Sequence, residues 1–380
     1  MNNMLYIKDI AIIVPFHKDT KMLELSLQTL TKTFNSGIPE IIVIANNANS
    51  KEININLDTN IFRIYKIEQD IFWPGAVNYG ARMTDKKYLL FCDPDIFYMP
   101  RWLEELISCY NRNAFVGAVS AKLVNPLNNQ IMDFGMGYNS FNTIHISKGL
   151  PFNHPYTQTD RKVQGACGAI LLTSHDLFDS VKGIDTSMPY IYCDNDYSIK
   201  VGEQGYTTWV AAKSIVYHKG NTDPNNSKYQ KYSYLREDSK ASFYAKNQDK
   251  RKIDFDYWLQ CAWEWYLKNT NNMKNNYCLF DFCTLPDHKS YIDELKHLGL
   301  HIIEERRIVL PVRDMDIINL CNYISPQMIT SKLPFIYFVD DFTSLSSNML
   351  WLAIRDTSND LVVDRQCNIL NMTDIYKYTI

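Results

Sequence analysis

The segments IAIIV (10–14), IIVIA (41–45) and YLLFC (88–92) decide the fold of this 380-residue chain. Each is a short, wholly apolar run, as expected of a parallel strand buried on both faces. Apolar residues recur with helical spacing between 21 and 34, and a second helix is expected at about 75–84. Strands that alternate with helices predict βαβ units and hence an α/β fold with a doubly wound, mostly parallel sheet.

The polar residues that follow these three runs predict a ligand-binding edge. Residues 15–17 (Pro-Phe-His) follow the first run, 46–47 (Asn-Asn) the second and 93–95 (Asp-Pro-Asp) the third. The carboxyl ends of parallel strands meet at one edge of a sheet, and ligands of doubly wound sheets bind there. We therefore expect a nucleotide-type cleft.

The composition excludes several classes of protein. With 46% hydrophobic and 21% charged residues the chain is typical of a globular protein. A net charge of −3 gives no reason to expect nucleic acid as a partner. There is no run of 18 apolar residues, so no membrane-spanning helix is expected, and the N-terminal apolar stretch, which contains Asp9, fits a core strand better than a signal peptide. Nine cysteines without CxxC spacing indicate reduced thiols and a cytoplasmic location.

The chain is expected to have three parts. Residues 1–250 form the main domain, 251–276 an aromatic helix with an Asn-rich linker, and 277–380 a small α/β domain of unassigned role. The aromatic helix could pack the small domain onto the main one, or form a homodimer contact, an acceptor platform or a peripheral membrane face. Further strands are expected at 61–67, 114–120, 164–172, 207–217, 277–282 and 334–339, a hairpin region at 131–147, and helices at 174–182, 194–204 and 289–298.

Two carboxylates one residue apart form the strongest local feature. Asp93 and Asp95, with Pro94 between them, can both face the cleft. Mn²⁺ and Mg²⁺ prefer hard oxygen ligands and keep open positions for phosphate oxygens, so a cation there would neutralise a departing diphosphate. The alternative is a surface turn that caps the next helix. The similar pair Asp340 and Asp341 has no such surroundings in the sequence, and we interpret it as a turn.

Asp194 and His218 are the other candidates for chemistry. Asp194 begins a predicted helix, so it could cap that helix and complement its dipole. It could instead be a general base that takes the proton of an incoming hydroxyl. His218 ends the strand at 207–217 and could complete a carboxylate–imidazole metal set, which suits Mn²⁺. A single histidine can equally be a core or surface residue.

Taken in order, these segments resemble the family 2-type glycosyltransferases. The resemblance runs through IAIIVPFHKD (10–19), IIVIANNANS (41–50), FWPGAVNYGARMTDKKYLLFCDPDIF (72–97), VQGACGAILLTSHDLFDSVKGID (163–185), YIYCDNDYSIKVGEQGY (190–206) and VYHKG (216–220). FWPGAVNYGA and CDNDYSIKV are most similar to the rhamnosyltransferase-like, O-antigen and capsule branch. The resemblance implies a GT-A fold and an inverting transfer of a sugar from a UDP-, dTDP- or GDP-linked donor.

The resemblance also implies roles for individual residues. Asp93 and Asp95 match the metal–diphosphate motif, His218 the third metal contact and Asp194 the catalytic base. The remaining donor-binding residues that it implies are Pro15 and Phe16 at the base pocket, Asn46 near the nucleoside, Asn78 and Gly80 under the nucleotide, and Gly165, Ala166 and Cys167 beside the donor sugar.

Two positions depart from the family pattern. Ala45 stands where the family usually has an acidic residue that helps to hold the base or ribose, which leaves the nucleotide open. Cys193 stands where the family has the glutamate of a Glu-Asp pair, so only the expected base, Asp194, is retained. The loss of acidity at these two positions is also the best support for the alternative function, a non-catalytic carbohydrate-binding or scaffolding protein.

The expected protein is thus a metal-dependent glycosyltransferase of bacterial surface polysaccharide synthesis. Its partners would be a nucleotide sugar and a saccharide or lipid-linked saccharide acceptor, in the cytoplasm or at the inner face of the membrane. A nucleotidyltransferase could share a similar sheet and an acidic metal site. Such enzymes usually carry a Gly-rich loop after the first strand, and VPFHKDTK (14–21) contains no glycine.

Overall fold

The computed structural model divides the chain into two compact units. Unit 1 consists of Met1–Met136 and Thr157–Lys252, and unit 2 of Gly137–Tyr156 and Ile253–Ile380. The segment 137–156 therefore belongs to unit 2, which differs from the expected main domain of 1–250. The structure describes residues 4–17, 19–34, 37–47, 57–220, 233–270, 276–307, 333–342, 358–372 and 374.

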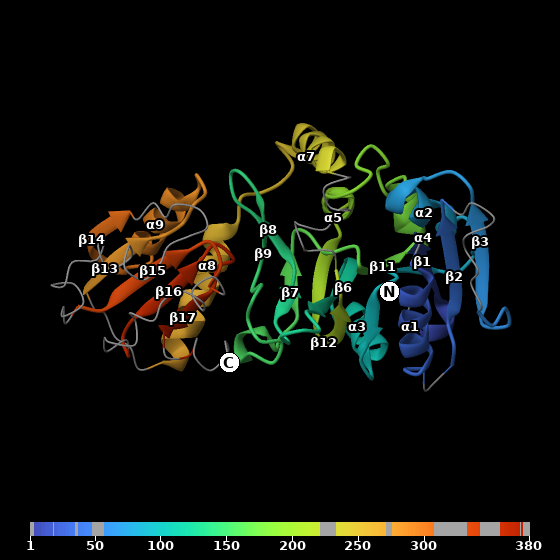
Figure 1. The fold of residues 1–380 in the computed structure, drawn as a ribbon, viewed down its shortest axis with the longest axis horizontal. Helices are drawn as coiled ribbons and strands as arrows, with labels where there is room; N and C mark the ends of the chain where they lie inside the picture. The colour runs from blue at the N-terminus through green and yellow to red at the C-terminus, as the bar shows by residue number, and fades with distance from the viewer. Residues whose placement is uncertain are drawn as a thin grey trace. The chain divides into compact units, whose positions relative to one another are not determined.

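A mixed sheet of ten strands forms the centre of unit 1 (Figure 1). Its strands are β1 (Ile10–Phe16), β2 (Glu40–Asn46), β3 (Phe62–Ile67), β4 (Tyr88–Cys92), β5 (Ile96–Tyr98), β6 (Val116–Val124), β7 (Ile131–Asp133), β10 (Arg161–Val163), β11 (Ile170–Ser174) and β12 (Thr207–His218). The main path is β10-β12-β6-β11-β4-β1-β2-β3, with β5 beside β12 and β7 beside β6. Strands β4, β1, β2 and β3 are mutually parallel, and β11 runs antiparallel between β4 and β6. The expected α/β fold with a mostly parallel sheet is confirmed.

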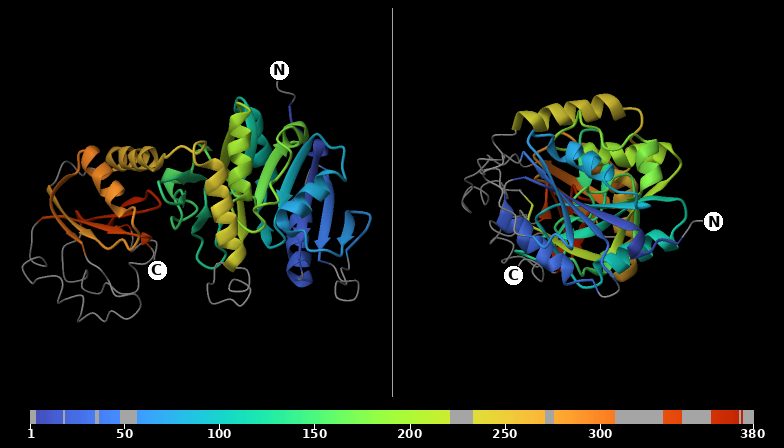
Figure 2. Two further views of the ribbon diagram at one scale, coloured as in Figure 1. Left: turned by 90° about the horizontal axis from the view of Figure 1, so that it is seen from above. Right: turned by 90° about the vertical axis from the view of Figure 1, so that its right-hand side faces the viewer.

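Helices cover both faces of this sheet (Figure 2). The helices of unit 1 are α1 (Thr20–Thr31), α2 (Phe72–Ala81), α3 (Trp102–Arg112), α4 (His175–Ser180), α5 (Cys193–Glu203) and α7 (Ser233–Asn247), and a 3₁₀ turn covers Ile7–Asp9. Side chains alternate between the faces of a strand, so Ile12 packs in one core cluster with Leu27 of α1. Ile13 points the other way, and a Cβ on Gly80 of α2 would come within 2.5 Å of its Cγ2. All seven residues of β1 are buried for this reason.

Unit 2 contains a second, smaller sheet. Its strands are β13 (Asn276–Asp281), β14 (His301–Arg307), β15 (Phe335–Val339), β16 (Leu361–Asp364) and β17 (Ile369–Asn371), in the order β14-β13-β15-β16-β17. Only β17 is antiparallel to its neighbour. Two helices, α8 (Phe255–Asn269) and α9 (His288–His297), and a pair of short strands, β8 (Met136–Tyr138) and β9 (Thr143–His145), complete the described elements of this unit. A 3₁₀ turn covers Pro155–Thr157.

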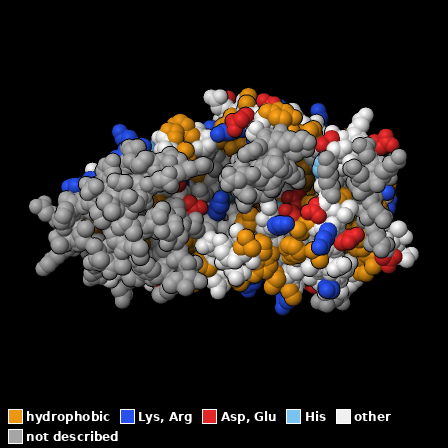
Figure 3. Space-filling model, viewed as in Figure 1, with side chains coloured by type: hydrophobic (Ala, Val, Ile, Leu, Met, Phe, Trp, Pro, Cys, Tyr) orange, Lys and Arg blue, Asp and Glu red, His pale blue; other side chains and the backbone are white. Residues whose placement is uncertain are grey.

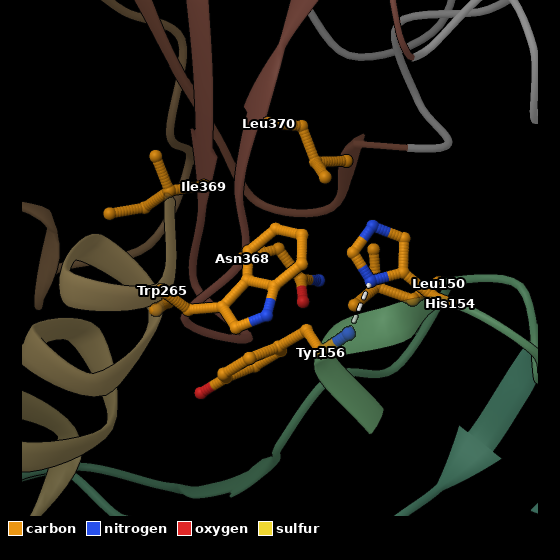
Figure 4. Close-up of a pocket in the computed structure, with 8 residues that line it drawn as sticks. Leu150, His154, Tyr156, Trp265, Asn368, Ile369 and Leu370 are labelled. Atoms are coloured by element: carbon orange, nitrogen blue, oxygen red, sulfur yellow. Dashed lines mark hydrogen bonds between the residues drawn. The ribbon is translucent and has the colours of Figure 1, made fainter. Parts of the chain in front are cut away.

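The aromatic helix α8 packs within unit 2. Phe255 lies 4.4 Å from the ring of Tyr291 on α9, measured between ring centroids. Trp265 lines a small pocket with His154 and Tyr156, where the Tyr156 N–H donates to His154 Nδ1 (Figure 4). This cavity of about 10 Å³ has room for about one water molecule and none for a sugar ring. Within the described residues, no helix is long and apolar enough to cross a membrane.

Candidate active site

Three side chains from distant parts of unit 1 meet at one edge of its sheet. Asp93 follows β4, Asp95 precedes β5, and His218 ends β12, which pairs antiparallel with β5 so that His218 is opposite Ile96. His218 Nε2 lies 3.2 Å from Asp95 Oδ1 and 3.7 Å from Asp93 Oδ2. One ligand atom from each residue lies within 4.8 Å of the other two. On the face shown in Figure 3, acidic side chains gather near the middle of unit 1.

This triad fits a divalent cation. Two carboxylates and one imidazole are a donor set that suits Mn²⁺. The side chains are 24%, 24% and 15% exposed for Asp93, Asp95 and His218, so an ion could reach them while protein shields them from most of the solvent. Among the described residues this is the one group of three or more potential ligands that are close enough to bind a single ion. The site residues predicted as metal ligands are therefore brought together.

The three side chains of the triad shift one another's pKa values. Burial raises the pKa of Asp93 to about 6, although the charge of His218 opposes it. Burial would also raise the pKa of Asp95, but its hydrogen bond with His218 and the charge of that ring outweigh it and hold the pKa below its ordinary value. Burial would lower the pKa of His218, but the two carboxylates outweigh it and raise the pKa. Without a cation the triad therefore retains a proton more strongly than its separate groups would.

Asp194 lies in the first turn of α5, beside the loop that leads into β11. Its Oδ2 accepts the Gly168 N–H at 2.8 Å, and its Oδ1 accepts the Asn195 N–H at 2.9 Å. Burial raises the pKa of Asp194, although these two N–H donors oppose it. A carboxylate whose pKa is raised is a stronger base. The charge of Asp194 also raises the pKa of Asp93, so the two carboxylates are near enough to interact.

The carboxyl ends of β1 and β2 lie near a carboxylate that the sequence analysis did not anticipate. Asn46 donates from Nδ2 to Asp70 Oδ1 at 3.0 Å and accepts the Ile71 N–H at 2.9 Å. Asp70 Oδ2 lies 3.9 Å from His17 Nδ1. Ala45 is fully buried in β2. The loop before α2 thus contributes a carboxylate that is hydrogen-bonded to Asn46, the residue after Ala45.

Residues 11–174, a little under half of the chain, match the family model described as glycosyl transferase family 2. This segment of the chain is therefore similar to the family 2 glycosyltransferases. Asp93 and Asp95 lie inside the matched segment, whereas Asp194 and His218 follow it. No curated protein is similar enough in sequence to this chain to serve as a relative.

Solved structures similar to this chain include two glycosyltransferases. GalNAc-T7 with UDP, GalNAc and Mn²⁺ is 14% identical over 64% of this chain and 52% of that one, with a TM-score of 0.46. The mannosyltransferase PcManGT from Pyrobaculum calidifontis, in complex with GDP-Man and Mn²⁺, is 11% identical over 78% of this chain and 86% of that one, with a TM-score of 0.41. The present chain thus spans about half the length of the first of them.

Several residues that the sequence analysis assigned to the nucleotide-sugar donor contact other parts of unit 1 in the structure. Phe16 is 2% exposed and belongs to the hydrophobic core, and Pro15 is buried in β1. Asn78 uses both ends of its amide on the backbone of Ile184, at 2.8 and 2.9 Å. Gly80 allows α2 to approach β1, as described above. Their contacts with a nucleotide stay a prediction.

The loop 164–169 is not a strand, because β11 begins only at Ile170. Gly165 makes an isolated bridge with Met136, and the N–H of buried Ala166 donates to Ser198 Oγ. Gly168 is the residue of this loop that contacts Asp194. The expected strand of 164–172 is therefore too long, since between Gln164 and Ala169 only Gly165 forms a bridge, and the Ala166 and Gly168 N–H groups donate to side chains.

Besides Asp70, the sequence analysis missed two residues of this site. Trp73 on α2 donates its Nε1–H to Asp93 Oδ1 at 2.8 Å. Asp133, at the end of β7, is 2% exposed, and its negative charge raises the pKa of both Asp194 and His218. Trp73 was missed because an indole carries no charge and is not a metal ligand, so its sequence position did not indicate a role in the site. Asp133 had a signal, a carboxylate directly after a short strand, but lies in a region where no βαβ pattern indicated which strand end it would join.

Proposed function

We propose that unit 1 transfers a sugar from a nucleoside diphosphate donor to a hydroxyl acceptor, with the help of a divalent cation. The observation that carries this proposal is the convergence of Asp93, Asp95 and His218 within 4.8 Å at the carboxyl edge of a mostly parallel sheet, the edge at which ligands of such sheets bind. The match of residues 11–174 to the family 2 model supports the proposal that unit 1 is a glycosyltransferase.

The metal triad has a definite task in this proposal. Asp93, Asp95 and His218 would hold the cation, which when bound supplies charge neutralisation for a diphosphate leaving group. The protein's part is to keep two carboxylates at one place with a single imidazole beside them. Such preorganised charge stabilisation is commonly one of the largest contributions to a rate enhancement.

Asp194 is the proposed general base. It removes the proton of the acceptor hydroxyl, whose oxygen forms a bond to the anomeric carbon as the bond from that carbon to the diphosphate oxygen breaks. Attack from the face opposite the nucleotide inverts the anomeric configuration. Gly168 and Asn195 fix the direction of the carboxylate through their N–H groups, and a well-placed base contributes about 10² to 10⁴ in rate.

The finer assignment rests on the resemblance of the motifs. We propose a hexosyltransferase-type enzyme with a UDP-, dTDP- or GDP-linked donor and a saccharide or lipid-linked saccharide acceptor, in bacterial surface polysaccharide synthesis. Asp70, Asn46 and His17 form the polar group at the proposed nucleoside end. The proposed location is the cytoplasm or the inner membrane face, a proposal that agrees with the absence of disulfides among the described cysteines.

A panel of nucleotide sugars tests this function. Thermal shift and slow donor hydrolysis are measured for UDP-, dTDP- and GDP-linked sugars, with and without Mn²⁺. A metal-dependent shift or hydrolysis with one donor is the expected result and names the nucleotide. If no donor gives a thermal shift or is hydrolysed, although the protein is folded, the proposal is overturned and a non-catalytic carbohydrate-binding module is favoured.

A further inference from the structure

One indole links the two functional carboxylates of unit 1. Trp73 donates its Nε1–H to Asp93 Oδ1 at 2.8 Å. The six-membered ring of the same indole lies against Gly168, whose N–H donates to Asp194. A Cβ on Gly168 would come within 2.9 Å of Trp73 Cη2 and 3.1 Å of Asp194 Cβ. The indole therefore contacts a proposed metal ligand at one end and the anchor of the proposed base at the other.

The position of Trp73 is fixed by contacts that do not involve Asp93. Its ring packs edge-on against Phe91 of β4, with centroids 6.3 Å apart and an interplanar angle of 84°. The preceding residue, Phe72, has a φ of 54°, an uncommon conformation for a residue other than glycine. Its N–H is held by Asp70 Oδ1 at 3.0 Å. These contacts hold the start of α2, and the packing on Phe91 holds the indole where its N–H meets Asp93.

We propose that Trp73 is a positioning residue that fixes the carboxylate of Asp93 for the cation and sets the distance between that cation and Asp194. This inference rests on the proposed function. With Oδ1 occupied by the indole, Asp93 presents Oδ2 to His218 and to the ion. The same ring limits how far the Gly168 loop can move towards Asp93. A direct displacement needs the base and the leaving group on opposite sides of one carbon. The distance between Asp194 and the cation that binds the leaving group therefore has to be fixed.

A double-mutant cycle tests the link. Trp73→Phe keeps an aromatic ring but removes the N–H donor, and Mn²⁺ affinity is expected to fall by about 10- to 100-fold, as for other outer partners of metal ligands. Gly168→Ala is expected to weaken Mn²⁺ binding too, although residue 168 is beside Asp194, because its Cβ would displace the indole. In a Trp73→Phe background the smaller ring leaves room, so Gly168→Ala should cost clearly less there.

Matched controls separate this link from a general loss of structure. Trp209→Phe removes another indole N–H donor of unit 1, which binds Thr207 Oγ1 at 2.9 Å. Gly202→Ala adds a Cβ that meets nothing within 4 Å. Both should leave Mn²⁺ affinity unchanged. The measurement is isothermal titration of the full chain with Mn²⁺ alone, together with kcat and KM for donor hydrolysis.

The outcomes distinguish the two proposals. If wild-type protein binds no Mn²⁺, the proposed function fails. If wild-type protein binds Mn²⁺ and folded Trp73→Phe binds it equally well, or if the two substitutions have additive effects, the linking role of Trp73 is wrong while the metal site stands.

Discussion

The two sheets of this molecule carry the same sequence pattern and use it differently. In unit 1 the buried strand β4 is followed by Asp93 and Asp95, and in unit 2 the buried strand β15 is followed by Asp340 and Asp341. The carboxylates of unit 1 converge on one histidine, with one ligand atom from each of the three residues within 4.8 Å of the others. Those of unit 2 form no such group among the described residues. An acidic pair after a buried strand is therefore not sufficient for a metal site.

The partners of the carboxylates explain the difference. In unit 2, Asp340 accepts hydrogen bonds from Cys283 Sγ and from the N–H and hydroxyl of Thr284. Arg365 Nη1 lies 4.0 Å from Asp340 Oδ1, and Nε and Nη2 of the same guanidinium bind Asp287. Asp340 is therefore held by the unit's own donors and lies beside a permanent cation. In unit 1 two carboxylates share one imidazole, so an ion still has negative charge to neutralise.

The largest effect expected from this contrast is on turnover. Asp194→Asn should reduce donor hydrolysis by about 10²- to 10⁴-fold, because the amide cannot take a proton. Its oxygen can still accept the Gly168 N–H, so donor affinity measured by titration should stay near the wild-type value. In unit 2, the exposed Asp256 lies in the first turn of α8 and accepts the Tyr257 N–H, as Asp194 accepts the Asn195 N–H, so Asp256→Asn should leave turnover intact. Wild-type turnover in Asp194→Asn would refute the base.

The second effect is a loss of stability that is confined to unit 2. Asp287 is 1% exposed and Arg365 7% exposed, so Arg365→Met leaves a buried charge without its partner and should lower the free energy of unfolding by about 3–5 kcal/mol. Lys296→Met breaks an exposed pair with Glu305 and should cost less than about 1 kcal/mol. Guanidinium unfolding measures both. Mn²⁺ affinity should be unaffected in native buffer, and a large loss of Mn²⁺ affinity would contradict the assignment of the metal site to unit 1 alone.

The third effect compares the two acidic pairs directly. Asp95→Asn keeps an acceptor for the Gly220 N–H but removes a charged metal ligand, so Mn²⁺ affinity should fall by more than the roughly 100-fold limit for outer partners. Asp340→Asn, its counterpart after β15, should leave Mn²⁺ affinity unchanged. Titration of both variants with Mn²⁺ checks this. Equal losses in the two would mean that the ion binds elsewhere.

The sequence predicted those parts that depend on local pattern. The runs at 10–14, 41–45 and 88–92 are buried parallel strands because both faces of the sheet are covered, and their polar ends meet because parallel strands end at one edge. His218 could be named as a partner of Asp93 because it also ends a strand. Its pairing next to Asp95 depends on β5, whose three residues are too few to show a pattern.

The parts that could not be predicted depend on contacts between distant segments. Trp73 becomes part of the site only because α2 begins next to β4. Asp133 joins the site through the pairing of β7 with β6. The segment 137–156 has no composition that separates it from its neighbours, yet it belongs to unit 2, where His145 N–H binds Gln366 Oε1 and Lys148 O binds Asn368. Such long-range bonds leave no local signal.

The smallest expected effect is the pH dependence of Mn²⁺ binding. An aspartate with a pKa of about 6, as for Asp93, is roughly one-tenth ionised at pH 5 and about nine-tenths ionised at pH 7. The cation has to displace this proton, so affinity should rise about tenfold from pH 5 to pH 7. The raised pKa of His218 acts in the same direction, because its proton must also leave. Titrations in two buffers of different ionisation enthalpy would measure the protons released. Affinity that is constant over this range, with no proton release, would mean that the ion does not bind to these buried groups, and the contrast between the two acidic edges would lose its physical basis.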